Sequence, residues 1–186
     1  YDALNRRVEG RDPLGNATLT GYNAIGSRTV ITDANGAVTR FVYDAANRLT
    51  TIDYPPSTGS GQAQSDVTFT YNKAGHHLTM NDGVGMTNYQ YDDLYRLTQV
   101  TQPSAAGGPP SVVGYGYDAV GNQTHLIYPN NQVVTYTYGS GNRLDTVTDW
   151  KNGQFGYNYD DANRLTALTL PNGVSSAYSY DDAGRL

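Results

Sequence analysis

Short runs of alternating apolar and polar residues fill the chain, and turn residues separate them. The run from Val133 to Tyr138 reads Val-Val-Thr-Tyr-Thr-Tyr, and Asn130 and Asn131 precede it. Alternation with a period of two is typical of a β-strand with two unlike faces, and Asn or Gly between such runs indicates a tight turn. The pattern therefore predicts an all-β protein of repeated antiparallel hairpins, with almost no helix.

The predicted strands recur at a nearly fixed spacing, which nine tyrosines mark at intervals of 21, 21, 28, 20, 26, 21, 21 and 21 residues. A fixed period along a whole chain is the signature of a repeat architecture. We therefore expect residues 1–186 to form a single array of nine repeats, each with two strands and two turns. The tyrosines that begin the repeats are Tyr1, Tyr22, Tyr43, Tyr71, Tyr91, Tyr117, Tyr138, Tyr159 and Tyr180.

Each tyrosine opens a common motif. Asp or Asn follows it in eight of nine repeats, and Gly or Asn stands four residues after it in eight of nine, with Tyr95 as the exception. Gly and Asn adopt a positive φ most easily, so a turn is expected there, and the turn at 92–96 should be strained or differently built. The motif acids and arginines are Asp2, Asp44, Asp92, Asp118, Asp160 and Asp181, with Arg6, Arg48, Arg96, Arg143, Arg164 and Arg185.

The recurring arginine needs a partner, because like charges on adjacent strands repel each other. The recurring aspartate can supply it. We expect contacts among Arg, Asp and Tyr to tie successive turns together along one rim of the sheet. The alternative is a solvated rim in which each ion pair contributes little.

Two intervals are long because inserts rich in Pro, Gly and Ser occupy the second turn of their repeats. They cover residues 55–66 and 102–111. Such composition is typical of loops, and the inserts leave the phase of the later repeats intact. We expect two surface loops and no domain boundary.

A second aromatic residue precedes most repeat tyrosines by two positions, so both rings share one face of the sheet. Stacked repeats would then form ladders of aromatic side chains, either as packing between strands or as a surface on which sugars stack. Packing explains the ladder without a ligand and is the preferred interpretation. These residues are Phe41, Phe69, Tyr89, Tyr115, Tyr136, Tyr157 and Tyr178.

Charge and composition exclude several classes of protein. A net charge of −5 without any basic run argues against binding to nucleic-acid phosphates. No apolar stretch is long enough to span a membrane, and the lack of Cys excludes disulfides and thiolate metal sites. We expect no cofactor and no nucleic-acid partner.

Candidate catalytic groups have simpler explanations as structural residues. Paired acids occur at 92–93, 160–161 and 181–182, but adjacent residues of a turn point apart and the first acid is needed to form the turn. His76 and His77 are neighbours on a strand, and His125 adds at most one further metal ligand. We therefore expect neither a metal site nor an enzyme.

The motif Tyr-Asp-x-x-Gly/Asn-Arg-Leu, in nine registered copies over all 186 residues, resembles the YD repeats of the Rhs family. That family includes Rhs polymorphic toxins of bacteria, the B and C components of insecticidal toxin complexes, and the shell of teneurins. The resemblance implies a β-solenoid or shell segment that encloses a C-terminal toxin or effector domain for export and delivery. It also implies a secreted or cell-surface location.

The partners implied by the resemblance are the enclosed C-terminal domain, the rest of the same shell, and secretion machinery or toxin-complex subunits. The aspartate-containing segment that frees the cargo in toxin members of the family is not recognisable in this chain. An alternative function is a cell-surface adhesion module, or a module that recognises carbohydrate or protein. Open sheet edges also allow the chain to associate with itself.

Overall fold

The computed structural model describes residues 1–56, 65–104 and 107–186, and β-strands dominate it. Sixteen antiparallel strands are hydrogen-bonded in the order of the sequence within one sheet. The single helical segment of the described residues is a short 3₁₀ turn at Ser140–Asn142. The prediction of an all-β chain built from repeated antiparallel hairpins is confirmed.

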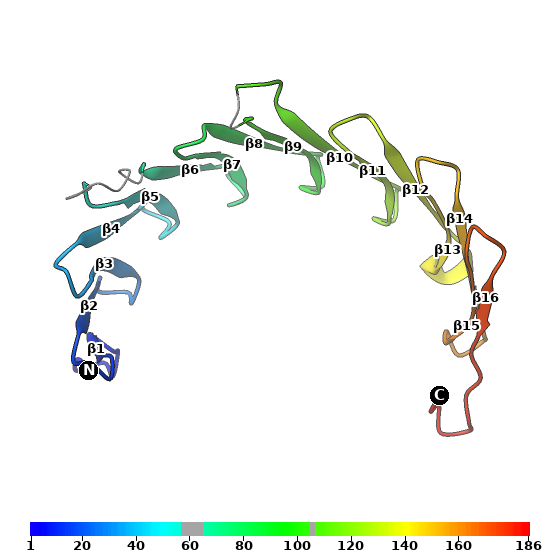
Figure 1. The fold of residues 1–186 in the computed structure, drawn as a ribbon, viewed down its shortest axis with the longest axis horizontal. Coiled ribbons are helices and arrows are strands. Elements are labelled where there is room, and N and C mark those ends of the chain that lie inside the picture. Colours follow the sequence, from blue (N-terminus) through cyan, green and yellow to red (C-terminus); the bar gives the residue numbers. More distant parts are fainter. Residues whose placement is uncertain (57–64, 105–106) are drawn as a thin grey trace. The chain divides into compact units, whose positions relative to one another are not determined.

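The chain divides into two compact units, and within each unit successive hairpins follow one another along the sequence (Figure 1). The first unit comprises Tyr1–Tyr89 and Gln102–Pro110, and the second comprises Gln90–Thr101 and Ser111–Leu186. Residues 57–64 and 105–106, which fall within the two predicted inserts, lie outside the described residues.

The strands of the first unit, with β8 continuing two residues beyond it, are β1 (Glu9–Arg11), β2 (Ala17–Tyr22), β3 (Arg28–Thr32), β4 (Val38–Tyr43), β5 (Leu49–Asp53), β6 (Val67–Tyr71), β7 (His77–Asn81) and β8 (Met86–Tyr91). Those of the second unit, which contains all of β9 except its last residue, are β9 (Leu97–Gln102), β10 (Ser111–Tyr117), β11 (Gln123–Ile127), β12 (Val133–Tyr138), β13 (Leu144–Thr148), β14 (Gln154–Tyr159), β15 (Leu165–Thr169) and β16 (Ser175–Ala177).

The turn after each repeat tyrosine uses the backbone geometry that the sequence predicted. In the turn that starts at Asp44, the backbone N–H of Asn47 donates to the carbonyl of Asp44, and the N–H of Asp44 donates to the carbonyl of Arg48. Asn47 takes a φ of 59°. This arrangement matches the three-residue hairpin loop that ends in a left-handed residue. The corresponding φ is positive in all nine repeats.

A β-bulge follows each of these turns where the strand register is defined. On β4 and β5, Val42 pairs with Thr51 but Tyr43 pairs with Leu49, so Thr50 is the extra residue. The bulge turns Leu49 to the same face as Ile52, although the two are three residues apart. The sequence analysis did not predict these bulges. Apolar residues three apart at a strand start, as in Leu165 and Leu168, were the available signal.

The two faces of the sheet differ in chemistry. The aromatic face carries aromatic and aliphatic pairs, whereas the threonine face is more polar and includes Thr–Thr pairs, pairs of Thr with Asn and the pair Arg40–Asp53. Examples on the aromatic face are Phe41–Ile52, Phe69–Met80, Tyr136–Val147 and Tyr157–Leu168. Examples on the threonine face are Thr51–Thr68, Thr70–Thr79, Thr135–Thr148 and Thr137–Thr146.

The described part of the chain has almost no closed core. Its buried residues are Val134 and Thr87, with 7% and 3% of their surface exposed, and most strand residues are half-buried. A single sheet buries each side chain only against its neighbours in the same layer. Contacts between adjacent hairpins must therefore supply much of the order in each unit.

The sequence predicted that the turn at 92–96, which contains Tyr95, is either strained or differently built, and the structure shows which. The N–H of Tyr95 donates to the carbonyl of Asp92, as in the other repeats, so the turn is not differently built. Tyr95 nevertheless has a φ of 60°. A side chain with a Cβ pays about 1 kcal/mol or more for this conformation.

We predict that Tyr95→Asn stabilises the protein by roughly 0.5–1 kcal/mol, because Asn tolerates a positive φ better than Tyr does. Urea unfolding followed by circular dichroism measures the change. Leu94→Asn, a polar substitution at the preceding exposed position, is the control and should bring no gain. An unchanged or lower stability of the Tyr95 variant would contradict the prediction.

Candidate functional site: a clasp between repeats

The aspartate that follows the repeat tyrosine uses its two carboxylate oxygens differently. One oxygen binds the backbone of the turn, and the other binds the arginine. In the repeat of Tyr43, Oδ1 of Asp44 accepts hydrogen bonds from the backbone N–H groups of Ala46 and Arg48, each at 2.9 Å. Oδ2 accepts from Nε of Arg48 at 2.7 Å and lies 2.6 Å from Nη2. The same carboxylate thus closes the turn and fixes the guanidinium group.

The fixed guanidinium then reaches the next repeat. Nη1 of Arg48 donates to the carbonyl of Asn72 at 3.0 Å, and the guanidinium carbon lies 4.8 Å from the centre of the Tyr71 ring. Tyr71 contacts the earlier repeat in return, since its hydroxyl donates to the carbonyl of Leu49 at 2.6 Å. We call this set of contacts the clasp; it combines an ion pair, a cation–π contact and two hydrogen bonds.

The clasp recurs within both compact units. Its ion pairs span 2.7 Å or less, and each guanidinium carbon lies 4.7 or 4.8 Å from the centre of the next tyrosine ring. Three sets have all four contacts, namely Asp2–Arg6–Tyr22, Asp44–Arg48–Tyr71 and Asp92–Arg96–Tyr117. The set Asp160–Arg164–Tyr180 has the ion pair, the cation–π contact and the tyrosine hydrogen bond. Asp181 and Arg185 form the same ion pair at 2.7 Å.

Repeats that lack one member of the clasp use a substitute. Gly139 supplies no carboxylate, and Arg143 instead donates to Oδ1 of Asn163 at 3.0 Å while it keeps its bond to the carbonyl of Asp160. Its guanidinium carbon lies 5.4 Å from the ring centre of Tyr159. In the repeat of Tyr117, Asn122 replaces the arginine and donates to Oδ2 of Asp118 at 2.9 Å.

Tyrosine hydroxyls supply a second link, which occurs even where the arginine is absent. Ser27 stands in the arginine position of its repeat, yet the hydroxyl of Tyr43 donates to the carbonyl of Arg28 at 2.8 Å. The tyrosines with this bond to the preceding repeat are Tyr22, Tyr43, Tyr71, Tyr117, Tyr138 and Tyr180. Two repeat tyrosines outside this list lie elsewhere: Tyr1 is 79% exposed, and Tyr91 is the last residue of β8.

Clasp contacts shift the pKa values of the groups involved. The guanidinium and backbone N–H of Arg48 hold the pKa of Asp44 below its ordinary value, and the N–H and guanidinium of Arg164 do so for Asp160. Hydrogen bonds and a positive charge favour the ionised carboxylate. Burial raises the pKa of Tyr71 and Tyr117. These tyrosine hydroxyls therefore stay protonated and able to donate.

The structure places the paired acids and the histidines in turns and strands of the repeats. Oδ1 and Oδ2 of Asp160 bind the turn and Arg164, whereas Asp161 is an exposed residue of the turn. Across the described ranges, no three His, Cys, Asp or Glu side chains form a group that could hold a metal ion. His77 lies among aromatic rings, with its centroid 4.6 Å from that of Tyr71 and 5.5 Å from that of Phe69.

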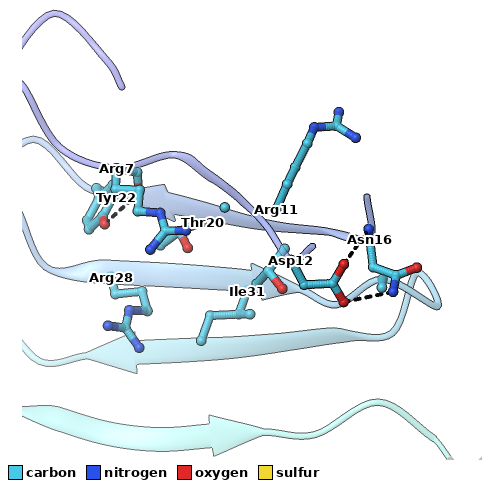
Figure 2. Close-up of a pocket in the computed structure, with 11 residues that line it drawn as sticks. Arg7, Arg11, Asp12, Asn16, Thr20, Tyr22, Arg28 and Ile31 are labelled. Carbon is cyan, nitrogen blue, oxygen red and sulfur yellow. Dashed lines mark hydrogen bonds between the residues drawn. The ribbon is translucent and has the colours of Figure 1, made fainter. Parts of the chain in front are cut away.

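A hollow of about 600 Å³ lies at the first hairpins, and its arginines were not singled out by the sequence analysis. Figure 2 shows Arg7 and Arg28 beside Tyr22, while Arg11 extends away from them. Arg7 occupies the space that a Cβ on Gly10 would need. Arg28 pairs with Tyr22, at the position where Leu49 faces Tyr43. An arginine in the leucine position of the repeat was the available signal.

We predict that Tyr117→Phe destabilises the protein by about 1 kcal/mol, because it leaves the carbonyl of Leu97 without its neutral donor. Thermal and urea unfolding measure the loss. Tyr115→Phe is the matched control on the same strand, since no hydrogen bond of its hydroxyl occurs in the described part of the chain, and it should change little. Equal effects of the two substitutions would contradict an energetic role for the hydroxyl link.

We predict that acid weakens the fold through the clasp aspartates. Their folded pKa lies below the unfolded one, so their contribution is present above the unfolded pKa and is lost as the pH falls through the folded pKa, below 3.8. Asp160→Asn should therefore be less stable than the unaltered protein at pH 7, and the difference should shrink toward pH about 2. Urea unfolding over this pH range measures it.

Asp161→Asn, which removes the neighbouring exposed acid, controls for net charge in that experiment. It should leave the pH dependence unchanged. A constant difference between the Asp160→Asn variant and the unaltered protein at every pH would contradict a contribution from the ionised carboxylate.

Solved structures similar to this chain come from toxin complexes. The chain aligns with TcdB2-TccC3 without its hypervariable C-terminal region at a TM-score of 0.72 and 23% identity, over 91% of this chain and 10% of the other. TcdB2-TccC3-Cdc42 gives 0.71 and 22% over 89% and 10%, and a Photorhabdus luminescens Tc holotoxin pore gives 0.66 and 22% over 87% and 9%. These likenesses show a shared fold, and the chain spans about a tenth of those chains.

Sequence comparison identifies the family. No curated protein matches the chain. The model of the RHS repeat matches residues 22–55, 117–154 and 159–186, which together make up more than half of the chain. These ranges contain the turn motif and most of the clasp residues. The chain belongs to the RHS repeat family.

Proposed function

We propose that this chain is a segment of an Rhs-type β-shell that encloses a C-terminal toxin or effector domain for export and delivery. The observation that carries the proposal is the clasp, which joins one hairpin to the next within each unit. Such links let hairpins be added in series without a core that grows with the chain, as in other repeat proteins. The family membership and the fold shared with the toxin complexes support it.

The distribution of charge also supports a container. Five of the six recurring acids are paired with arginines at the turns. The strand faces carry mainly uncharged groups, with few charged residues such as Arg28, Arg40 and Asp53. A wall with few free charges gives an enclosed polypeptide no strong point of attachment. In this role the chain performs no chemistry itself, and any activity belongs to the cargo.

The proposal includes a set of partners and a location. Residues 1–186 would form part of one continuous array, in contact with the rest of the shell, with the enclosed domain and with secretion machinery or other toxin-complex subunits. The complete protein would be secreted or displayed at a cell surface. No helix formed by the described residues is long and apolar enough to cross a membrane.

We predict that the complete protein protects a C-terminal domain from protease, because an enclosed domain is inaccessible until the wall opens. The domain should be cleaved at least about tenfold more slowly within the complete protein than when produced alone. Replacing Arg48, Arg96 and Arg164 together with Ala should weaken three clasps and shorten the protection. Cleavage is followed by electrophoresis and mass spectrometry.

The matched control replaces three basic residues outside the clasps, Arg11, Lys73 and Lys151, with Ala, and should leave protection intact. Equal cleavage of the domain with and without the repeats would overturn the container. A complete protein that ends in a surface anchor, without a C-terminal domain of unrelated composition, would favour adhesion instead.

A further inference from the structure

Arg143 is a motif arginine without the acid that the other motif arginines have. In five repeats the arginine forms an ion pair with the aspartate four residues earlier, as Arg48 does with Asp44. Gly139 stands at this position before Arg143, and no carboxylate of the described residues forms an ion pair with Arg143. Its positive charge therefore lacks the balance that the repeat provides elsewhere.

Arg143 nevertheless keeps the contact to the next repeat. Its Nη1 donates to the carbonyl of Asp160 at 3.1 Å, as Nη1 of Arg48 donates to the next repeat at 3.0 Å. The second hydrogen bond of Arg143, to Oδ1 of Asn163, also comes from Nη1. Nε and Nη2, which bind the carboxylate in a clasp, have no acceptor in the described part of the chain. The guanidinium is thus held in place with its carboxylate-binding edge unused.

The backbone of the same turn also departs from the repeat. In the turn at Asp44 a carboxylate oxygen accepts two backbone N–H groups. Among the described residues no side-chain oxygen accepts the equivalent N–H groups of Gly141 and Arg143. The turn contains the 3₁₀ segment Ser140–Asn142 instead, with a φ of 75° at Gly141, whereas Ala46 at the equivalent position has no positive φ. The missing carboxylate therefore coincides with a change in both the arginine and the turn.

The space that an aspartate would take is open. A hollow of about 210 Å³ borders Arg143, and residues of this turn and of β14, among them Gly139 and Tyr157, line it. The nearest atom to a Cβ on Gly139 would be the Cβ of Asp145, at 4.0 Å, which is an ordinary contact distance. A water molecule takes about 30 Å³ of liquid volume, so the hollow has room for a carboxylate and the group that bears it.

We propose that the turn at 139–143 binds a carboxylate group from outside the repeat, in the place that Asp44 and its equivalents occupy. Arg143 donates to it through Nε and Nη2, a charge-assisted geometry in which arginine binds carboxylates strongly. The carboxylate belongs either to a small organic acid or to an acidic side chain of another polypeptide, and the chemistry of recognition is the same. Its binding completes the clasp between the repeats of Tyr138 and Tyr159. The site does not depend on the proposed container.

Asp145 limits which anions the site accepts. It is the extra residue of the bulge, at the position of Thr50 and Thr166 in other repeats, and it lines the same hollow. Its Oδ2 accepts a hydrogen bond from the hydroxyl of Thr146 at 3.4 Å. The negative charge of Asp145 repels a ligand with two negative charges more than a ligand with one. A single carboxylate therefore suits the site better than a phosphate monoester.

The Nε–Hε resonance of Arg143 in a ¹⁵N NMR spectrum reports on this donor directly, and its loss in Arg143→Lys assigns it. We expect this resonance to shift saturably with sodium acetate at pH 7. Sodium chloride at equal ionic strength and acetamide, the uncharged analogue of acetate, should not shift it. Half-saturation should fall at about 1–100 mM, because a ligand of so few atoms binds weakly.

Two capped tripeptides, one with a central aspartate and one with a central asparagine between alanines, distinguish the sources of the carboxylate. Half-saturation by the aspartate peptide at a concentration at least about tenfold below that of acetate assigns the site to a polypeptide side chain. Equal or weaker binding of that peptide assigns it to a small organic acid. The asparagine peptide should not shift the resonance.

Gly139→Asp supplies the carboxylate from within the repeat. It should abolish the response to acetate and raise the melting temperature by about 2–4 °C, because it completes a clasp. Gly139→Ala is the matched control, which removes the glycine but leaves the carboxylate position open, so it should keep the response. The φ of −85° at Gly139 is accessible to either residue.

Asp145→Asn should lower the half-saturating acetate concentration at least about twofold, because it removes a like charge from the hollow. The proposal is overturned if acetate shifts the Arg143 resonance no more than chloride does, or if Gly139→Asp responds to acetate as the unaltered protein does. It is equally overturned if Asp145→Asn lowers the melting temperature as much as Asp160→Asn does, since Asp145 would then be the acid that serves Arg143.

Discussion

The ion pair between an aspartate and the arginine four residues later is the interaction on which the rest of the structure depends. A single sheet without a covering layer gives its hairpins little hydrophobic burial, so neighbouring hairpins must be joined through their side chains. The carboxylate holds the guanidinium in the one direction from which it reaches the next repeat. An unpaired, mobile arginine would lose more side-chain entropy in making the same contact.

Variation inside the chain shows how the parts of the clasp depend on each other. Where serine or histidine replaces the arginine, at Ser27 and His76, the preceding acid is also replaced, by Asn23 and Asn72. An amide still accepts the backbone N–H groups that form the turn. The charge is present mainly where a guanidinium needs it. Turn formation and the link between repeats are thus separable functions of one side chain.

The pairing of charges at the turns shapes what the faces of the sheet can do. With most of the recurring acids and bases engaged there, the strand surfaces carry mainly aromatic, aliphatic, hydroxyl and amide groups. Departures from the repeat then become conspicuous, as with Arg28 in a leucine position and Trp150 in a position of alanine or proline. Such departures distinguish individual repeats from one another, while the common motif recurs along the chain.

The sequence by itself determined the strands, the period and the turns, because each depends on residues close together in the chain. Asn47 and its equivalents predicted a positive φ, and the recurring Asp and Arg predicted their own pairing. Only the tertiary structure decided that Arg48 reaches Asn72, that Thr50 forms a bulge, and that Trp150 meets Tyr128. These contacts depend on the register between strands. The local pattern does not determine that register to better than one residue.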